Sequence, residues 1–413
     1  MSPVKIGVIA DDFTGASDIS MVLSENGMRT VQYSGTPKAT RATEVDAGVI
    51  ALKTRTTEKT TAINLSLEAA DWLLPQGCDQ LIYKVCSTFD STREGNIGPV
   101  TEALAKRLNA DQVLVCPAYP EMNRTVFQGH LFVKDQLLSE CGMQNHPLTP
   151  MTDPDIRRWL SHQCEWPVHH LSLAQLRSDI CQDHAKRFKP GHILVDAINH
   201  SDLMRIGSIA SGYKLVTGAA GIAHALAKNY PPGAVRSRWV GTKGKGVVLC
   251  GSCSYTTLAQ IEHYAKSFPV RDISVESLIV GSLELDSLVR WVLRQDKDRP
   301  GLLFTTASPE RVQELQNSHG RVGIASMIET MFAKLSRKLI GAGVTRMVVA
   351  GGETSGAVVE ATGIQQMEIG PRIAAGVPAM HIPQSGLAIA LKSGNFGEAD
   401  FFEHALRVLQ GEV

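Results

Sequence analysis

The chain has 413 residues, of which 43% are hydrophobic and 20% are charged. This length exceeds what one ordinary hydrophobic core supports, so two domains are expected. Lys and Arg together number 41, as do Asp and Glu, and the formal net charge is therefore +0. Such a balance gives no electrostatic reason to expect a nucleic acid or an anionic membrane as a partner.

The N-terminus enters a strand-like segment without the charged, apolar and small-residue regions of a signal peptide. Because no apolar stretch is long enough to span a bilayer, we expect a cytoplasmic protein. The cysteines are scattered, and we expect them to behave as small buried apolar residues. Cys250 and Cys253 have CxxC spacing, but no second such pair accompanies them, so a zinc site is not expected.

Strand-like and helix-like segments alternate through the first half of the chain. Residues 5–10 form an apolar run that ends at Asp11 and Asp12, and a helix is expected over residues 14–26. Further strands are expected at 29–33, 47–52, 80–84, 112–116 and 193–195. This alternation indicates βαβ units, in which ligand-binding residues follow the carboxyl ends of parallel strands.

Residues 228–246 are rich in Pro, Gly and basic residues and form the best candidate for an interdomain linker. Beyond them the alternation resumes, with expected elements at 247–250, 302–305, 322–340 and 346–350. The chain is therefore predicted to be an α/β protein with two domains, each a mainly parallel sheet flanked by helices. The predicted boundaries are 1–230 and 246–413.

Turns rich in small residues follow strands of the second predicted domain. In the turn that begins at Gly351, a strand is followed by glycines and a helix, and a phosphate can approach such a backbone. Thr354 and Ser355 are expected to cap this helix and to donate to phosphate oxygens. An ordinary capped turn would look the same, but similar turns at 251–254 and 392–397 favour convergence on one nucleotide.

The P-loop and dinucleotide-binding fingerprints are both missing from the sequence, so neither of those nucleotide sites is supported. The candidate nucleotide-binding residues are Ser252, Ser254, Gly351, Gly352, Glu353, Thr354, Ser355, Gly356, Gly394, Asn395 and Gly397.

In the first predicted domain, Asp11 and Asp12 follow the first strand. Adjacent side chains of a strand point in opposite directions, so one of the two is expected to face a ligand. That carboxylate could bind hydroxyls, accept a proton or help to hold Mg²⁺. The alternative is that one of them only caps the helix that begins near Thr14.

Two further strand ends carry polar groups. The segment 84–96 is dense in hydroxyl groups and contains one Lys, one Arg and two acids, although a solvated loop would have a similar composition. After the strand at 112–116, Arg124 could form a two-pronged pair with a carboxylate. Carboxylate, hydroxyl, ammonium and guanidinium groups together suit a small polyhydroxy acid.

These segments resemble the four-carbon acid sugar kinases over essentially the whole chain. The resemblance is carried by residues 10–16 (ADDFTGA), 84–96, 349–356 (VAGGETSG) and 392–397 (KSGNFG). It implies an N-terminal domain that binds the acid and a C-terminal domain that binds ATP, with Mg²⁺ bridging the phosphates. The expected partners are the small acid and ATP. A neutral surface with apolar helices permits a dimer without requiring one, so we expect a monomer or homodimer.

Within this family, residues 86–98 and 117–129 are most similar to the 3-oxo-tetronate kinases. Many threonate and erythronate kinases carry a Lys-x-Asp-Ser-Thr-x-Arg-Gly pattern. Here Glu94 stands in the usual arginine place, and Lys84 lies farther from Asp90. The expected activity is therefore phosphorylation of the 4-hydroxyl of 3-oxo-tetronate, with D-threonate or D-erythronate 4-kinase as the alternative.

For this reaction Asp12 is expected to orient or deprotonate the hydroxyl, with Asp11 and Asp90 as alternatives; metal ligands stay unassigned. The expected substrate-binding residues are Lys84, Ser87, Asp90, Ser91, Arg93 and Arg124. Two other classes of protein are less consistent with the sequence. A nucleotide-dependent dehydrogenase is disfavoured by the missing fingerprint, and a non-catalytic sensor of small acids is disfavoured by the acids and hydroxyls at the strand ends.

Overall fold

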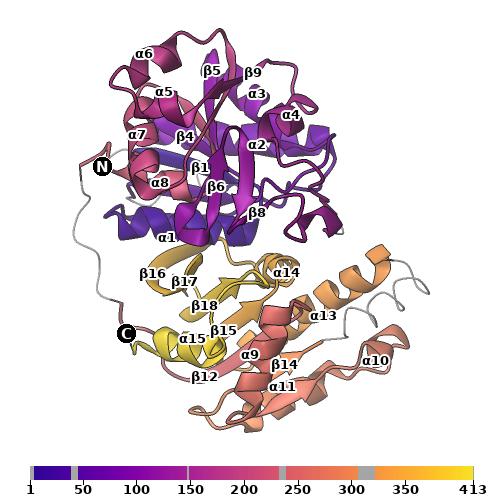
Figure 1. Cartoon of the computed structure of the whole chain (residues 1–413). Coiled ribbons are helices and arrows are strands. Elements are labelled where there is room, and N and C mark those ends of the chain that lie inside the picture. Colours follow the sequence, from indigo (N-terminus) through magenta and orange to yellow (C-terminus); the bar gives the residue numbers. More distant parts are fainter. Residues whose placement is uncertain (1–3, 39–44, 147, 232–238, 306–320, 413) are drawn as a thin grey trace. The chain divides into compact units, whose positions relative to one another are not determined.

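The computed structural model describes residues 4–38, 45–146, 148–231, 239–305 and 321–412 (Figure 1). The chain divides into two compact units, Met1–Arg236 and Ser237–Val413. Residues 232–238, in the middle of the expected linker, lie outside the described residues.

The first unit is built on a sheet in which all neighbouring strands are parallel. Its central strands are short and completely buried, as expected where helices cover both faces of a parallel sheet. Their order is β2 (Thr30–Ser34), β3 (Ala47–Ala51), β1 (Ile6–Ala10), β4 (Gln80–Lys84), β11 (Leu215–Gly218), β5 (Gln112–Cys116), β10 (Gly191–Val195) and β9 (Val168–Leu171).

The helices of the first unit connect these strands. The longer ones are α1 (Phe13–Glu25), α2 (Lys59–Leu73), α3 (Ile97–Leu108), α7 (His200–Ala210) and α8 (Gly221–Ala227). The short ones are α4 (Ile156–Ser161), α5 (Leu173–Arg177), α6 (Cys181–Lys186), η1 (Leu74–Gln76), η2 (Pro120–Met122) and η3 (Met143–Asn145). A separate antiparallel sheet, which the sequence analysis did not predict, consists of β6 (Arg124–Phe127), β7 (His130–Val133) and β8 (Gln136–Leu137).

The second unit has a mixed sheet. Its order is β13 (Val270–Asp272), β14 (Gly301–Phe304), β12 (Lys245–Cys250), β15 (Val344–Ala350), β18 (Leu387–Lys392), β17 (Val377–Ile382) and β16 (Gln366–Ala374). The first five strands in this order, from β13 at the edge to β18, are parallel to one another. The last two, β17 and β16, continue the sheet with antiparallel pairing. The mainly parallel α/β architecture is therefore confirmed, with an antiparallel extension that was not predicted.

The helices of the second unit are α9 (Tyr255–Ala265), α10 (Val275–Ile279), α11 (Leu285–Arg294), α13 (Arg321–Gly341), α14 (Gly352–Thr362) and α15 (Phe401–Gln410). Helix α15 buries Phe401, Phe402, Leu406 and Leu409 in a cluster with side chains of the sheet. No helix in the described ranges combines the length and the apolar character that crossing a membrane requires.

Strand register brings the candidate residues to one edge of each sheet. In the first unit, Ala10 pairs with both Ala51 and Lys84, so the chain leaves β1, β3 and β4 at the same level. In the second unit, Ala350 pairs with both Cys250 and Lys392. The turns after β12, β15 and β18 therefore begin side by side, as the strand-end rule for parallel sheets requires.

Candidate functional site

A cluster of carboxylates around one arginine lies at the carboxyl edge of the first unit's sheet. Arg55 donates from Nε and Nη2 to the two carboxylate oxygens of Asp11, at 2.9 and 2.8 Å. Its Nη2 is also 2.9 Å from Oδ1 of Asp12, and its Nη1 is 4.0 Å from Oδ2 of Asp90. The two-pronged geometry fixes the guanidinium and leaves a partly exposed acidic edge beside it.

Arg55 was missed by the sequence analysis, although a signal for it existed. It follows β3 by a few residues, and its backbone N–H and that of Thr54 both donate to the carbonyl oxygen of Asp11. The strand at 47–52 had been predicted, so extending the strand-end rule to its carboxyl end would have selected this arginine.

Asp12 has the helix-capping role that the sequence analysis left open. It is the N-cap of α1, in an extended conformation, and its Oδ1 accepts the N–H of Gly15 at 3.0 Å. Its Oδ2 accepts the hydroxyl of Thr14 at 2.8 Å. Burial opposes ionisation of Asp12, but the charges of Arg55 and Lys84 outweigh it and lower the pKa of Asp12. For Asp11, burial dominates over Arg55 and raises the pKa.

Lys84 ends β4 inside the same cluster and is only 2% exposed. Its Nζ donates to the carbonyl of Val85 at 2.8 Å. A Cβ on Gly15 would lie 2.9 Å from this Nζ and 2.2 Å from Oδ1 of Asp12. Glycine at position 15 is therefore what lets the first turn of α1 come this close to the lysine.

The loop after β4 carries Asp90, and hydrogen bonds fix the side chains of Asp90 and Ser91. Phe89 has a left-handed φ of 56°, a strained conformation for an aromatic residue, and it is completely buried. Asp90 accepts the hydroxyl of Thr88 at 2.5 Å. Ser91 is 2% exposed, and its Oγ accepts from Trp159 and Gln163, each at 3.0 Å. Ser91 thus anchors the loop.

Among the described contacts, none joins Ser87, Arg93 or Arg124 to this cluster. Ser87 is half-buried and Arg93 is exposed. Arg124 donates to the carbonyl of Met122, and no contact described for it reaches the carboxylates. The described contacts therefore group four expected residues with Arg55: Asp11, Asp12, Lys84 and Asp90.

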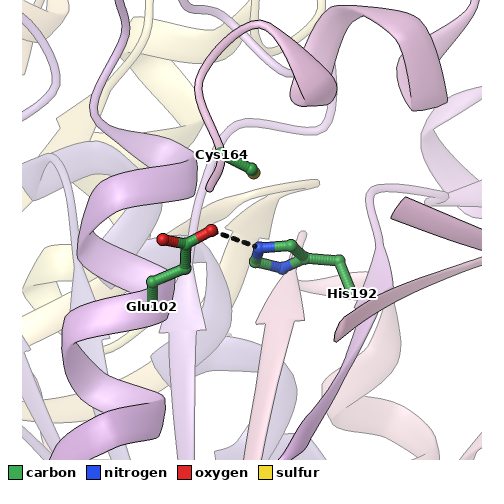
Figure 2. A group of neighbouring side chains, drawn as sticks. All are labelled: Glu102, Cys164 and His192. Carbon is green, nitrogen blue, oxygen red and sulfur yellow. Dashed lines mark hydrogen bonds and ion pairs between the residues drawn. The ribbon is translucent and has the colours of Figure 1, made fainter. Parts of the chain in front are cut away.

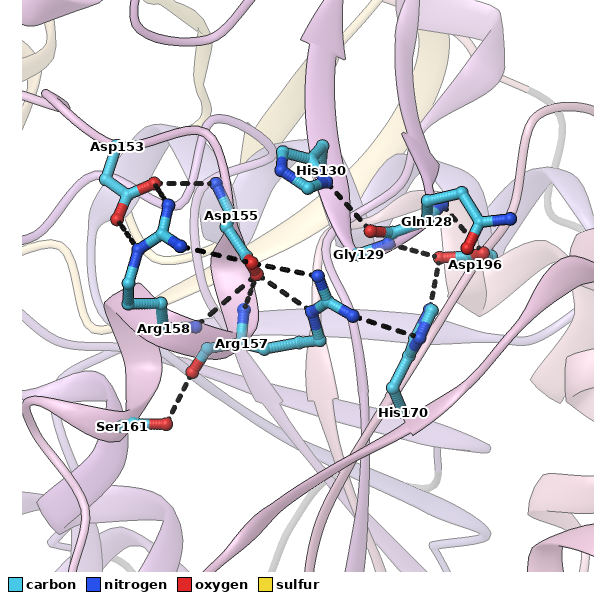
Figure 3. Close-up of polar contacts among 10 residues, drawn as sticks. All are labelled: Gln128, Gly129, His130, Asp153, Asp155, Arg157, Arg158, Ser161, His170 and Asp196. Atoms are coloured by element: carbon cyan, nitrogen blue, oxygen red, sulfur yellow. Dashed lines mark hydrogen bonds and ion pairs between the residues drawn. The ribbon is translucent and has the colours of Figure 1, made fainter.

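A second polar network lies at the carboxyl end of β10 (Figure 3). Asp196 is fully buried and accepts the N–H groups of Gln128 and Gly129, at 2.9 and 3.0 Å. It also pairs with Nε2 of His170 at 2.8 Å, and the other ring nitrogen of His170 faces Arg157. Since these groups satisfy one another, the network serves to hold the β6–β7 hairpin against the main sheet of this unit.

In the second unit, the turns after β12 and β18 are joined by hydrogen bonds. The hydroxyls of Ser254 and Thr257 both donate to the carbonyl of Gly394, each at 2.7 Å. The side-chain amide of Gln260 donates to the carbonyls of Phe396 and Gly397, at 3.0 and 2.9 Å. The predicted convergence of these turns is therefore present in the structure.

The turn after β15 lies against the turn after β12. A Cβ on Gly251 would lie 2.3 Å from Oγ1 of Thr354, and one on Gly351 would lie 3.3 Å from the backbone nitrogen of Ser252. A Cβ on Gly394 would likewise lie 2.6 Å from Oγ of Ser252. Glycines therefore make possible a close meeting of backbones from all three strand ends.

The expectation that Thr354 and Ser355 cap α14 is wrong. The helix begins at Gly352, and its N-cap is Gly351, with a φ of 119° and no side-chain cap. Thr354 and Ser355 lie inside the first turns and are buried. Because no side chain caps this end, the first N–H groups are available to an anion, which the positive end of the helix dipole also favours.

The remaining expected residues of this region lie in α14 and in the turn after β18. Gly352 and Glu353 are exposed, Gly356 is buried, and Ser355 Oγ is buried with no hydrogen-bond partner among the described residues. In the turn after β18, Asn395 is exposed and Gly397 has a φ of 85°. An uncapped helix end, close glycine contacts and nearby hydroxyls together fit a phosphate group.

Glu102, Cys164 and His192 are the described residues that come close to a metal-binding arrangement (Figure 2). Their candidate ligand atoms lie within 4.8 Å of one another. However, Oε1 of Glu102 already accepts two backbone N–H groups, at 2.9 and 2.8 Å, and lies 3.3 Å from Nε2 of His192. Burial also raises the pKa of Cys164, which keeps it a thiol. These contacts indicate a structural role, in which Glu102 binds the backbone of residues 165 and 166 and holds that loop in place.

Comparison with protein families assigns a type to each unit. Residues 6–226 match the model of a sugar-binding N-terminal domain, and residues 247–402 match that of a nucleotide-binding C-terminal domain. The chain thus combines a domain that binds sugars with one that binds nucleotides. It belongs to the family of four-carbon acid sugar kinases, as its motifs indicated.

Curated relatives match over almost the entire chain. A 3-oxo-tetronate kinase of Pseudomonas savastanoi pv. phaseolicola is 43% identical, over 98% of this chain and 97% of its own length. One of Haemophilus influenzae is 42% identical, over 97% of this chain and 98% of its own length. A crystal structure from Salmonella typhimurium LT2 has 40% identity and a TM-score of 0.88, covering 98% of this chain and 99% of its own.

Proposed function

We propose that this protein transfers the γ-phosphoryl group of ATP to the 4-hydroxyl of 3-oxo-tetronate, giving ADP and 3-oxo-tetronate 4-phosphate. The observation that carries the proposal is the 41% to 43% identity with 3-oxo-tetronate kinases over 97% or more of this chain. The chemistry of the two strand-end clusters supports the same assignment.

The cluster in the first unit suits a small hydroxy acid. Asp12 is ionised at neutral pH because its pKa is lowered, and its side chain is 26% exposed. It can therefore accept a hydrogen bond from the substrate hydroxyl and orient it for in-line attack. Phosphoryl transfer through a loose transition state needs positioning more than a strong base, so a weakly basic carboxylate is adequate.

Arg55 and Lys84 are the cations best placed for the carboxylate of the acid. Arg55 is held by Asp11, and its Nη1 is only loosely engaged, 4.0 Å from Asp90. A substrate carboxylate can compete for this donor in two-pronged geometry. In this proposal Asp11 fixes the arginine and Asp12 orients the hydroxyl, while Asp90 binds a second hydroxyl. Ser91 supports the loop.

The turns of the second unit suit the phosphates of ATP. The uncapped N-terminus of α14 offers backbone N–H groups, with Thr354 in its first turn and Ser252 beside Gly351, while Ser254 lies against Gly394. Mg²⁺ would neutralise phosphate charge, held mainly by phosphate and water oxygens, and Glu353 is the carboxylate nearest this helix end in the sequence. Because the reaction consumes ATP, we propose a cytoplasmic location. As the working unit we propose a monomer or a homodimer.

The test is Mg²⁺-dependent release of ADP across a panel of acids: 3-oxo-tetronate, D-threonate, D-erythronate and their enantiomers. The proposal expects kcat/KM for 3-oxo-tetronate to exceed that for the others by about tenfold or more. Preferential turnover of threonate or erythronate would replace the substrate and keep the kinase. Binding of an acid without turnover of any would instead indicate a sensor.

A further inference from the structure

Lys392, the last residue of β18, is a fully buried lysine that belongs to none of the roles assigned above. Its Nζ donates to Oγ1 of Thr257 at 3.1 Å and to the carbonyls of Gly394 and Phe396, at 3.0 and 3.1 Å. The rings of Phe401 and Phe402 lie on it, with centroids 5.5 and 5.9 Å away. Three acceptors thus match the three N–H groups of an ammonium ion.

These contacts fix the orientation of peptide groups in the turn that follows. The carbonyl of Gly394 accepts from Lys392 and also from Ser254 and Thr257. In a trans peptide the N–H of the next residue points opposite to the carbonyl. With the carbonyls of Gly394 and Phe396 turned toward the buried ammonium, the N–H groups of Asn395 and Gly397 are turned away from it.

We propose that Lys392 is a positioning residue of the nucleotide site, which holds the 393–397 turn so that the N–H groups of Asn395 and Gly397 face the phosphates. The inference rests on the proposed function, because it names what keeps that nucleotide-binding turn in shape. The lysine acts through the backbone and does not touch the nucleotide, which agrees with its complete burial.

The protonation state of this lysine gives the proposal a distinctive signature. Burial lowers the pKa of Lys392 to about 8 and outweighs the opposing effect of Cys250 on β12. Burial raises the pKa of Cys250 to about 12, so its thiol stays neutral across this range. The rings of α15 do not titrate. Above a pH of about 8 the neutral amine of Lys392 has two N–H groups for its three acceptors, so one of these three hydrogen bonds is lost.

The same titration does not weaken the fold. The pKa of Lys392 in the folded protein is below its ordinary value of 10.5, so the unfolded chain binds more protons between the two values. Stability from this group therefore rises with pH across that window. A loss of nucleotide affinity above a pH of about 8 without a loss of thermal stability is what separates positioning from general support of the fold.

The experiment measures the Kd of ADP by calorimetry on the full chain, without the acid. Lys392→Met removes the donors and keeps the length of the side chain. Thr257→Val removes one donor to Gly394 and one acceptor of Lys392, without burying a new charge. Lys245→Met is the control, since Lys245 donates to the carbonyls of Leu293 and Gln295, at 2.8 and 2.7 Å, from the first residue of β12 at the opposite edge of the sheet.

We expect Lys392→Met to raise the Kd about tenfold, Thr257→Val to raise it about threefold, and Lys245→Met to leave it within about twofold. The wild-type Kd should rise between about pH 7 and about pH 9, above the second phosphate pKa of about 6, and that rise should vanish in Lys392→Met.

An unchanged Kd in Lys392→Met, or an undiminished pH dependence in that variant, overturns the inference. If Lys392→Met does not fold, Thr257→Val and the wild-type pH profile decide it: a flat profile together with an unchanged Thr257→Val overturns it. A wild-type chain that binds no ADP at any pH would defeat the proposed function itself, whereas equal binding by wild type and variants defeats this inference alone.

Discussion

Replacing Arg55 by Met tests the carboxylate cluster of the first unit. The substitution keeps a long apolar side chain and removes the guanidinium that lies between Asp11 and Asp12. Asp11 has a side chain only 2% exposed, so its charge would be left buried without its partner. We expect this variant to be clearly less stable and to lose kinase activity.

The magnitude follows from the burial of the pair. Removing one partner of a buried ion pair costs about 3–5 kcal/mol. Arg55 is itself 22% exposed, so water can solvate part of the site once it is gone. We therefore expect the free energy of unfolding to fall by about 3 kcal/mol at neutral pH, the lower end of that range.

The assay is urea-induced unfolding of the first unit, followed by tryptophan fluorescence. Arg107→Met is the matched control, because Arg107 pairs with Asp71 at 2.6 Å while both side chains are about half exposed, at 49% and 55%. That surface pair should contribute less than about 1 kcal/mol. The double variant Asp11→Asn with Arg55→Met should recover much of the lost stability. Equal losses in the two arginine variants, or no recovery in the double variant, would refute the reasoning.

Three further predictions concern single residues. Asp12→Asn should lower kcat by about a hundredfold or more, while the KM for ATP stays within about twofold in steady-state assays. Gly394→Ala should raise the KM for ATP about fivefold or more, because the added Cβ would lie 2.6 Å from Oγ of Ser252. Gly341→Ala is the control, since a Cβ there would meet no atom within 4 Å. Equal KM values in the two variants would contradict this prediction. Glu102→Gln should lower the free energy of unfolding by about 1–2 kcal/mol at neutral pH. Burial opposes ionisation, but hydrogen bonds lower the pKa of Glu102, so this difference should shrink as pH falls below the ordinary value of 4.5; a metal chelator should leave wild-type stability unchanged.

The parts of the site that the sequence predicted follow from strand patterns. Apolar runs located β1 and β4 in the first unit and β12 and β15 in the second, and parallel pairing then places their carboxyl ends at one edge of each unit's own sheet. Asp11, Asp12 and the glycine-rich turns were predicted on that basis. The same pattern suggested that one of the two aspartates caps the following helix, and in the structure Asp12 does so.

The parts that were not predicted depend on contacts between distant segments. The strand-end rule applied to β3 would have pointed to Arg55, but nothing near Arg55 in the sequence shows that it pairs with Asp11, 44 residues earlier. The antiparallel strands β16 and β17 were missed because Gly370, Pro371 and Pro378 interrupt their apolar pattern. Similarly, hydroxyl residues after a glycine pair suggested a cap for α14, but the left-handed φ of Gly351 moves the helix start ahead of them.

The measurement that tests the central claim most directly is identification of the phosphorylated product. The chain is incubated with 3-oxo-tetronate, Mg²⁺ and ATP labelled in the γ-phosphoryl group, and the products are separated and analysed by mass spectrometry and phosphorus NMR. The account predicts that the label appears on the 4-oxygen of the acid, in step with ADP. Label found only in inorganic phosphate, at a rate that does not depend on the acid, would contradict it.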